Sequence, residues 1–345
     1  MTNTILKVEN LSVTFETYGG TVHAVRGISF ELREGETLSI VGESGSGKSV
    51  TIRAILGILT GNATIASGSI MYRGTDLTKV TEEDFHRIRG KLISLVFQDP
   101  LSALNPIMKI GKQIAEALQL SKGMKKPEAN ARALELMRSV SIPEPEKRFN
   151  QYPFQFSGGM RQRVVIAIAL ASDPEILICD EPTTALDVTV QAQILELITD
   201  LKRKRNLSVI FITHDLGVVA NTADRVAVMY AGKVVETGTV DEIFYDARHP
   251  YTWALLSSMP DLETKEQLFA IPGAPPNMLH PPVGDAFAPR NTYAMKIDRR
   301  LEPPEYRITD THSVSTWLQH PSAPAVEKPR VLTERIERML ERRNQ

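Results

Sequence analysis

The stretch that decides the fold is Gly42-Glu43-Ser44-Gly45-Ser46-Gly47-Lys48-Ser49. An apolar run at residues 38–41 precedes it, and a helical pattern at residues 49–59 follows it. In this strand–loop–helix context the G-x-x-x-x-G-K-S spacing indicates a phosphate-binding loop rather than a flexible Gly/Ser turn. The glycines let several backbone N–H groups point at phosphate oxygens, and the N-terminus of the helix favours negative charge there. The sequence therefore predicts a nucleotide phosphate site.

Two side chains of this loop have expected roles of their own. Lys48 supplies a positive charge for the β- and γ-phosphates, and the hydroxyl of Ser49 is suited to ligate Mg²⁺. The candidate nucleotide-binding residues of the loop and the first helical turn are Gly42, Ser44, Gly45, Gly47, Lys48, Ser49 and Val50.

A second candidate region is the apolar run at residues 176–179 with the two acids that follow it. Taken alone, an acidic pair after a strand is more often a strand-end cap. Beside a phosphate loop, Asp180 is expected to hold Mg²⁺ directly or through water, and Glu181 to orient or deprotonate the attacking water. The pair therefore predicts a hydrolytic centre.

The remaining pattern is that of an α/β protein. Short apolar runs at 92–97, 209–213 and 226–230 are typical of strands buried in a parallel sheet, and residues 189–204 have helical spacing of apolar side chains. Residues 11–15 and 28–32 alternate like antiparallel strands. The segment 100–156 lacks strand patterns, so we expect a largely helical region inserted between two strands of the sheet.

Composition excludes several classes of protein. The 345 residues carry 40 Lys+Arg against 41 Asp+Glu, so no broad basic field favours nucleic acid, and the basic run 202–205 is best explained as a solvated helix end. A single cysteine excludes a disulfide framework and a multi-thiolate cluster. The first ten residues show no secretory signal, and the longest apolar run, 164–171, is far shorter than the roughly 20 residues of a membrane span. We therefore expect a soluble cytoplasmic protein.

Proline distribution predicts the domain organisation. Residues 1–245 hold 8 prolines and residues 246–345 hold 13, which indicates a boundary near 246–250. The apolar side chains of Trp253, Phe287, Tyr293 and Trp317 favour a packed segment over a passive tail, and residues 331–343 have an amphipathic helical pattern. We predict a nucleotide-binding domain at 1–248, with its helical subdomain at about 100–156, an accessory domain at 249–325 and a tail helix at 326–345.

The segment 156–163, FSGGMRQR, resembles the signature of the ATP-binding cassette (ABC) family, the motor subunits of ABC transporters. The resemblance implies a P-loop NTPase core with an antiparallel β-subdomain, an inserted helical subdomain and here a small C-terminal accessory domain. It also implies that two cassettes pair head to tail, so that Ser157, Gly158 and Gly159 close over ATP held by the partner. Met160 stands where Gln is commonest in the family, and we expect little loss from this difference.

Other positions match the family in the same order along the chain. Gln98 resembles the Q-loop glutamine, which implies contacts with Mg²⁺ and the lytic water, and residues 185–187 resemble the D-loop. His214 resembles the switch histidine that contacts the γ-phosphate. Phe15 resembles the aromatic residue that stacks on adenine, with Tyr18 as the alternative. The implied catalytic residues are thus Glu181, His214 and Gln98, and the implied Mg²⁺ ligands are Ser49, Gln98 and Asp180.

A narrower resemblance is to the ATPase subunits of oligopeptide and dipeptide importers. It rests on the segments 98–106, 248–256, 271–276, 284–290 and 317–320. Many relatives bind an iron–sulfur cluster through four cysteines in the C-terminal part. The corresponding positions here are Asp285, Asn291, Asp298 and Thr316, so no four-thiolate cluster is predicted, and a hard cation at Asp285 and Asp298 is a minor alternative. This cysteine-free segment resembles the oligopeptide importers of Gram-positive bacteria.

The resemblance implies an ATP-hydrolysing subunit that powers an oligopeptide importer, bound peripherally at the cytoplasmic face of the plasma membrane. The implied cofactors are ATP and Mg²⁺. The implied partners are a second, distinct ABC ATPase subunit, two transmembrane permease subunits and an extracytoplasmic peptide-binding protein, without nucleic acid. Alternatives are import of dipeptides or nickel, or a soluble ABC ATPase acting on ribosomes or DNA. A cassette that only binds ATP is disfavoured because Lys48 and Glu181 are present.

Overall fold

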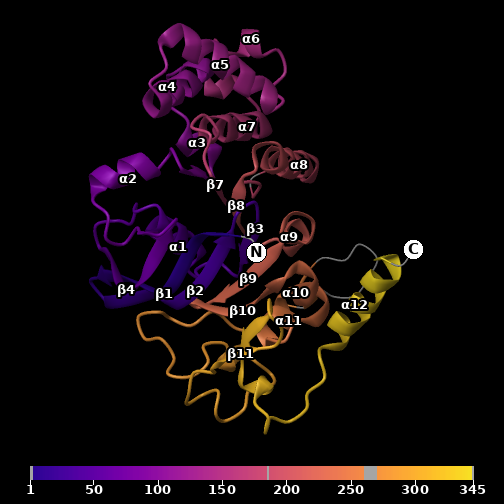
Figure 1. Ribbon diagram of the computed structural model, residues 1–345. Helices are drawn as coiled ribbons and strands as arrows, with labels where there is room; N and C mark the ends of the chain where they lie inside the picture. The colour runs from indigo at the N-terminus through magenta and orange to yellow at the C-terminus, as the bar shows by residue number, and fades with distance from the viewer. Residues whose placement is uncertain (1–2, 185, 260–269, 344–345) are drawn as a thin grey trace. The chain divides into compact units, whose positions relative to one another are not determined.

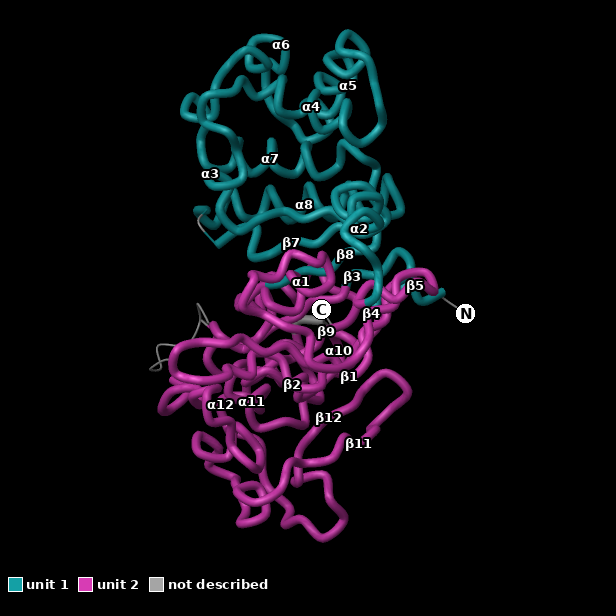
Figure 2. Tube along the Cα trace, turned by 90° about the vertical axis from the view of Figure 1, so that its left-hand side faces the viewer, with its two compact units in different colours: residues 1–5, 32–37, 79–212 teal, residues 6–31, 38–78, 213–345 magenta. Residues whose placement is uncertain are grey.

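The computed structural model describes residues 3–184, 186–259 and 270–343 (Figure 1). The chain divides into two compact units, which Figure 2 colours separately. Unit 1 comprises residues 1–5, 32–37 and 79–212, and unit 2 comprises residues 6–31, 38–78 and 213–345. Each unit therefore gathers segments that lie far apart in the sequence.

Unit 1 contains three parallel strands, β6 (Ile93–Val96), β7 (Ile176–Asp180) and β8 (Ser208–Thr213). Strand β7 lies between the other two, and Ile176 is paired in register with Ile93 on one side and with Ser208 on the other. Nearly every residue of these strands is buried, as expected for parallel strands with both faces covered. The three apolar runs that predicted them are confirmed as strands.

The predicted helical region also lies in unit 1 (Figure 2). Helices α4 (Ile110–Lys122) and α5 (Lys126–Ser139) pack side by side, since Ile110, Ile114 and Leu118 recur every four residues and are fully buried. The remaining helices of this unit are α2 (Glu82–Ile88), α3 (Pro100–Ala103), α6 (Pro145–Arg148), the 3₁₀ turn η1 (Pro153–Gln155), α7 (Gly158–Ala169) and α8 (Val188–Arg205).

Unit 2 contains an antiparallel sheet of four strands in the order β2-β1-β4-β5. The alternating patterns at 11–15 and 28–32 belong to two strands of 14 residues each. Both strands extend into residues whose sequence alternates less clearly between apolar and polar side chains. The strands are β1 (Thr4–Thr17), β2 (Gly20–Arg33), β4 (Ala63–Tyr72) and β5 (Thr75–Asp76).

The second sheet of unit 2 is mixed. Strand β3 (Thr37–Val41) runs parallel to β9 (Arg225–Tyr230), and β10 (Lys233–Thr239) returns antiparallel to β9. The short strands β12 (Ser313–Ser315) and β11 (Glu305–Arg307) extend the sheet from β10. The helices of this unit are α1 (Lys48–Ile55), α9 (Leu216–Thr222), α10 (Val240–Asp246), α11 (Pro250–Ser257), α12 (Arg330–Arg343) and the 3₁₀ turns η2 (Ala288–Arg290) and η3 (Trp317–Gln319).

Helix α1 is shorter than the predicted span of 49–59. It ends at Ile55, where Leu56 caps it and Gly57 adopts a left-handed conformation with φ 61°. Glycine at this position is a common stop signal for a helix, because it takes a positive φ without steric cost.

The part of the chain that follows residue 248 is called the C-terminal region below. It shares its hydrophobic core with the strands of unit 2. Trp253 is 4% exposed, Phe287 2% and Leu332 1%, and all three belong to one cluster with Val226 and Val228 of β9. Ile336 and Met339 of α12 pack against this cluster, in line with the amphipathic pattern of the tail. The predicted domain boundaries at 248 and 325 stay predictions, and residues 260–269 and 344–345 of the predicted accessory and tail segments lie outside the described residues.

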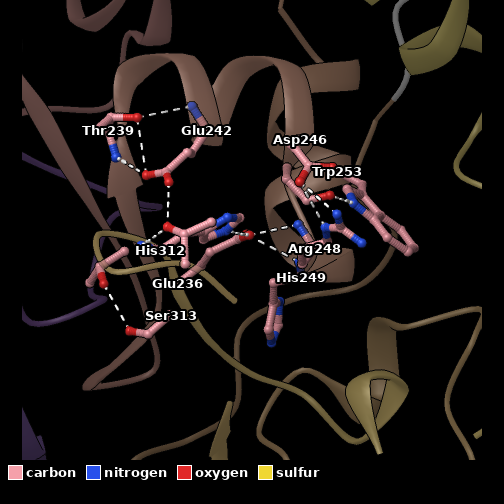
Figure 3. A network of polar contacts seen from close by, with 12 residues as sticks. Glu236, Thr239, Glu242, Asp246, Arg248, His249, Trp253, His312 and Ser313 are labelled. Carbon is pink, nitrogen blue, oxygen red and sulfur yellow. Dashed lines mark hydrogen bonds and ion pairs between the residues drawn. The ribbon is translucent and has the colours of Figure 1, made fainter. Parts of the chain in front are cut away.

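A polar network also ties the C-terminal region to the sheet (Figure 3). The buried carboxylate of Glu236 on β10 accepts hydrogen bonds from the backbone N–H groups of Arg248 (2.6 Å) and His249 (3.1 Å), and Oε1 lies 2.8 Å from Nε2 of His312. Nearby, Glu242 of α10 accepts hydrogen bonds from the hydroxyls of Thr309 (2.6 Å) and Thr311 (2.8 Å). Glu236 and Glu242 therefore connect the segment 236–249 with residues 309–312, which follow these two carboxylates by 67 to 76 positions in the sequence.

Within the described residues, no helix combines the length and the apolar character that crossing a membrane requires. The predicted α/β architecture, with its antiparallel sheet, parallel strands and inserted helical region, is confirmed.

Candidate nucleotide site

Two glycines set the course of the phosphate loop in unit 2. Gly42 has φ 149°, and a Cβ atom there would overlap with the backbone oxygen of Met229 on β9. Gly47 has φ 103°, and a Cβ atom there would lie 2.7 Å from the backbone oxygen of Ala24. Only glycine fits both positions, because neither the backbone angle nor the space admits a side chain. The loop is thus held close to two neighbouring strands at both of its ends.

Lys48 begins helix α1 and folds back over the loop. Its side chain is buried, and Nζ donates hydrogen bonds to the backbone oxygens of Gly42 (2.7 Å) and Glu43 (2.9 Å). Ser44 and Gly45 are exposed at the tip of the loop, and Ser49 and Val50 are half-buried in the first helical turn. An ammonium group and the N-terminus of a helix therefore meet within one short loop, which is the arrangement that binds phosphate.

In unit 1, the predicted catalytic acid and the predicted Q-loop residue are in contact. Glu181 follows β7 in a left-handed conformation with φ 46°, and its backbone N–H donates to the oxygen of Ile212 at 3.0 Å. Its Oε2 atom accepts hydrogen bonds from Nε2 of Gln98 (3.1 Å) and from the hydroxyl of Thr184 (3.0 Å). The carboxylate of Glu181 is thus held by two side chains from different segments.

The signature segment begins helix α7 in the same unit. The hydroxyl of Ser157 caps the helix by accepting from the backbone N–H of Met160 at 3.4 Å. Gly159 is buried, and a Cβ atom there would overlap with Cγ1 of Val190 on α8. A Cβ atom on Gly158 would lie 3.4 Å from Cδ2 of Leu186. The signature glycines are therefore packed against α8 and the D-loop.

The D-loop residue Asp187 starts helix α8. Its Oδ1 accepts a 3.0 Å hydrogen bond from the backbone N–H of Val190 and so caps the helix. Ala185 of the same predicted loop lies outside the described residues.

His214 and the two aromatic candidates lie in unit 2. His214 is exposed and follows β8, directly before Asp215, which caps α9 by accepting from the backbone N–H of Gly217 at 2.8 Å. Phe15 is half-buried on β1 opposite Ala63, whereas Tyr18 is fully exposed in the turn before β2. The choice between Phe15 and Tyr18 as the adenine contact stays a prediction.

The four positions compared with cluster-binding cysteines share one structural role. Each side chain accepts a hydrogen bond from a backbone N–H two or three residues away, at distances of 2.9, 2.9, 2.6 and 3.3 Å for Asp285, Asn291, Asp298 and Thr316. Such local bonds are how Asp, Asn and Thr stabilise turns. In the part of the chain that the structure describes, no group of three or more His, Cys, Asp or Glu side chains is placed to hold a metal ion.

Burial also shifts the pKa of three groups that have no assigned role in the nucleotide site. It raises the pKa of Asp285 to about 6, with smaller contributions from Asp298 and Glu302, and it lowers the pKa of His249 to about 3. The thiol of Cys179, on β7 and completely buried, has a pKa raised by burial and by the neighbouring Asp180. His249 is therefore neutral near pH 7, which lets its Nδ1 accept from the backbone N–H of Tyr251 at 3.0 Å.

Two contacts of the site were not predicted. Thr184 holds Glu181, and the only signal was a hydroxyl three residues after the acid, which is too common to be informative. Glu43, within the phosphate loop, pairs with Arg290 at 2.6 Å. Nothing in the local sequence of either residue indicates a partner 247 positions away.

Two segments of the chain match known protein families. Residues 25–184 match the family described as ABC transporter, and residues 235–297 match the family described as oligopeptide/dipeptide transporter, C-terminal region. The first match includes the phosphate loop, the signature and Glu181. The second includes Arg290 and two of the four turn-capping positions, Asp285 and Asn291.

Similar proteins cover nearly the whole chain. The oligopeptide transport ATP-binding protein OppD of Bacillus subtilis is 58% identical over 338 residues, covering 97% of this chain and 94% of that protein. The dipeptide transport ATP-binding protein DppD of Lactococcus lactis is 56% identical, covering 93% of each. Among solved structures, a dimeric ATP-binding cassette in a post-hydrolysis state with ADP and Pi is 28% identical, with a TM-score of 0.61 over 68% of this chain and 98% of that one.

Proposed function

Because this chain belongs to the ATP-binding proteins of ABC transporters of the oligopeptide and dipeptide type, we propose that it hydrolyses ATP to power oligopeptide import across the plasma membrane. The family assignment makes it an ATP-binding protein and an ATPase. The observation that carries the hydrolytic role is the carboxylate of Glu181, held by Gln98 and Thr184.

The phosphate loop supplies the binding energy for ATP in this proposal. When ATP binds, the ammonium of Lys48 replaces its hydrogen bonds to the loop carbonyls with hydrogen bonds to phosphate oxygens. The backbone N–H groups at the start of α1 donate to the same oxygens. Gly42 and Gly47 keep the loop narrow enough for the backbone to approach the phosphates. Phe15 is the proposed stacking partner of adenine, and His214 the proposed contact of the γ-phosphate.

Glu181 is the proposed general base. A carboxylate held by two hydrogen-bond donors is fixed in orientation, so it can accept a proton from a water placed in line with the γ-phosphate. Gln98 would hold both Glu181 and that water. This arrangement positions the nucleophile, which is the main contribution that a protein makes to phosphoryl transfer.

Mg²⁺ is the expected metal of the reaction. The hydroxyl of Ser49, the amide oxygen of Gln98 and the carboxylate of Asp180 are hard oxygen donors, the ligand type that Mg²⁺ takes, and Asp180 is only half-buried. When bound, the ion would neutralise charge on the β- and γ-phosphates.

Two cassettes are needed for a closed site in this proposal. Ser157, Gly158 and Gly159 would close over ATP held by the phosphate loop of a second, distinct cassette. Two permease subunits would supply the path through the membrane, and an extracytoplasmic binding protein would deliver the peptide, with this chain at the cytoplasmic face. Support comes from the likeness to a transport ATP-binding protein over 97% of the chain.

The decisive experiment is ATP hydrolysis and peptide uptake by the assembled transporter in vesicles. The Glu181→Gln variant should retain ATP binding and lose most of the hydrolysis, because the amide cannot accept the proton. The matched control is Glu196→Gln, which changes an exposed acid of α8. If Glu181→Gln hydrolyses ATP like the unaltered protein, the assignment of the base is wrong, and if peptides neither stimulate hydrolysis nor accumulate, the transport role is wrong.

A dipeptide substrate is the second candidate. It is favoured by the 56% identity with the dipeptide transport ATP-binding protein of Lactococcus lactis. Uptake of a labelled pentapeptide in competition with unlabelled dipeptides separates the two, since a dipeptide importer is inhibited by the dipeptides at far lower concentrations.

A further inference from the structure

The guanidinium of Arg290 lies against the phosphate loop. Its Nη1 donates a 2.6 Å hydrogen bond to Oε2 of Glu43, and its Nη2 donates a 2.9 Å hydrogen bond to Oε1 of the same carboxylate. Glu43 is the second residue of the loop, directly after Gly42. Two parallel bonds between a guanidinium and a carboxylate form a bidentate ion pair, which fixes orientation as well as supplying energy.

Arg290 is itself held in place from the C-terminal region. Its side chain is 5% exposed. Nε donates to the backbone oxygen of Pro272 at 2.8 Å, and Nη1 also donates to the hydroxyl of Tyr230 at 3.2 Å. All three nitrogens of the guanidinium are therefore engaged, so its direction toward Glu43 is set by the surrounding fold rather than by the pair alone.

The backbone of Glu43 is held from the same region. Its N–H donates a 2.8 Å hydrogen bond to the hydroxyl of Tyr251 on α11, a fully buried side chain. The ring of Tyr251 packs against those of Tyr230 (4.5 Å between centroids) and Phe287 (5.2 Å). Because Phe287 is three residues before Arg290, one aromatic cluster supports both contacts with the loop.

Glu43 connects the C-terminal region with Lys48, the lysine that is proposed to bind phosphate. The backbone oxygen of Glu43 accepts a hydrogen bond from Nζ of Lys48, while the N–H and the carboxylate of Glu43 are held by Tyr251 and Arg290. Every polar group of Glu43 is thus engaged: the loop itself holds the backbone oxygen, through Lys48 and the N–H of Ser46, and the C-terminal region holds the N–H and the carboxylate.

The charge of Glu43 explains why such a contact is needed. A carboxylate in the first turn of a loop that binds a polyphosphate repels the ligand, and the repulsion is largest where the site is shielded from water. The bidentate guanidinium neutralises that carboxylate and keeps it turned toward the C-terminal region.

We propose that Arg290 is a positioning residue for nucleotide binding, which neutralises Glu43 and, together with Tyr251, holds the first turn of the phosphate loop. The C-terminal region therefore takes part in ATP binding through the chain's own loop. This inference rests on ATP binding at that loop, as the proposed function requires.

The test is the equilibrium dissociation constant of the purified full-length chain for ATP, ADP and AMP, measured by titration calorimetry. Arg290→Gln should weaken ATP binding by about tenfold, because it leaves a carboxylate unpaired beside the phosphates. The loss should decrease from ATP to ADP to AMP, as the negative charge of the ligand decreases. Arg290→Lys should recover part of the affinity, since it keeps the charge and loses the bidentate geometry.

The double variant Glu43→Gln/Arg290→Gln separates the charge from the fold. It removes both members of the pair, so ATP affinity should return to within about threefold of the unaltered protein. The single variant Glu43→Gln keeps Arg290 and should bind ATP at least as tightly as the unaltered protein, which tests the proposal even where Arg290→Gln does not fold.

Two controls keep the interpretation specific. Arg335→Gln removes an arginine of α12 that donates to the backbone oxygens of Leu256 and Met259 and is not a partner of Glu43, so it should leave all three affinities unchanged. Lys48→Ala should abolish ATP binding, and if it does not, the nucleotide site itself is misassigned. With Lys48→Ala behaving as expected, an Arg290→Gln variant that binds ATP normally, or a double variant as weak as Arg290→Gln, overturns the positioning role.

Discussion

Nε2 of Gln98 donates a hydrogen bond of 3.1 Å to Oε2 of Glu181, joining two residues that are 83 positions apart in unit 1. The hydroxyl of Thr184 donates to the same oxygen at 3.0 Å. The carboxylate is therefore oriented by two donors of different origin. One comes from the segment after β6, and the other comes from the turn after β7.

Removal of the first donor should slow hydrolysis without preventing ATP binding. Gln98→Ala is expected to lower kcat of the assembled transporter about tenfold to a hundredfold and to change KM for ATP much less, because orientation of the base matters in the transition state. Thr184→Ala should have a smaller effect, since Gln98 still holds the carboxylate. A Gln98→Ala variant with raised KM and unchanged kcat would show that Gln98 serves binding instead.

Gly159 should be the least replaceable glycine of the signature for stability. A Cβ atom there overlaps with Val190 of α8, so Gly159→Ala is expected to lower the free energy of unfolding by about 1–3 kcal/mol through overpacking. Urea denaturation of the purified chain measures the change.

The double variant Gly159→Ala/Val190→Ala tests the cause, because the smaller side chain makes room for the new methyl group. Gly61→Ala is the control, since a Cβ atom there meets no other atom within 4 Å. Equal losses in the single and the double variant would rule out the contact with Val190 as the reason.

Asp285→Asn should stabilise the protein at neutral pH. Burial raises the pKa of Asp285 to about 6, above its ordinary value of 3.8, so the folded state binds a proton more readily than the unfolded state. Stability from this group is fully present below pH 3.8 and is lost as the pH rises through 6. Asparagine keeps the acceptor for the N–H of Phe287 and carries no charge, so the gain should be about 2 kcal/mol at pH 7.5.

The pH dependence is the check on this prediction. The advantage of Asp285→Asn should shrink as the pH falls from 6 toward 4, where the unaltered carboxyl group is protonated in the folded state. Asp310→Asn changes a fully exposed acid of the same region and should show no advantage at any pH. An advantage of Asp285→Asn that is constant from pH 4 to 7.5 would contradict the assigned pKa.

Glu236→Ala should strongly destabilise the protein. It leaves the backbone N–H groups of Arg248 and His249 and the ring of His312 without the carboxylate that they bind, in a site where the side chains of Glu236 and His312 are fully buried. Unmade hydrogen bonds of buried groups are costly, so the free energy of unfolding should fall by about 3–5 kcal/mol. Thermal and urea unfolding measure it, with Glu305→Ala on the short strand β11 as the exposed control. A loss under 1 kcal/mol, on the scale of a surface pair, would show that the network carries little of the stability.

Those parts of the fold that depend on local patterns were predictable from the sequence. Short, mainly apolar runs at 38–41 and 226–230 predict buried strands because parallel strands are covered on both faces. The phosphate loop was predictable because the local backbone requires glycine at fixed positions. Gly42 and Gly47 both have a positive φ and leave no room for a Cβ atom. Strands β11 and β12 were not, since three residues are too few to display an alternation.

The tertiary contacts of the site could not be predicted. The pairing of Arg290 with Glu43 depends on how the C-terminal region packs on β9, and the sequence around Arg290 is a proline-rich stretch without periodicity. The resemblance to a known family predicts that Gln98 and Glu181 both act in hydrolysis. It does not predict the hydrogen bond between them, because that bond depends on how segments 83 positions apart come together in the fold. Motifs identify the residues that touch a ligand more readily than those that hold such residues in place.

The complete burial of Cys179 has a practical consequence for work on the assembled transporter. It is the only cysteine of the chain, and its thiol lies within β7 with a pKa raised by burial, so reagents that attack thiolates should not modify it in the folded protein. The natural sequence is therefore already suited to fluorophores, spin labels and cross-linkers. A single cysteine introduced at an exposed position such as Val283 would be the one reactive label on the chain.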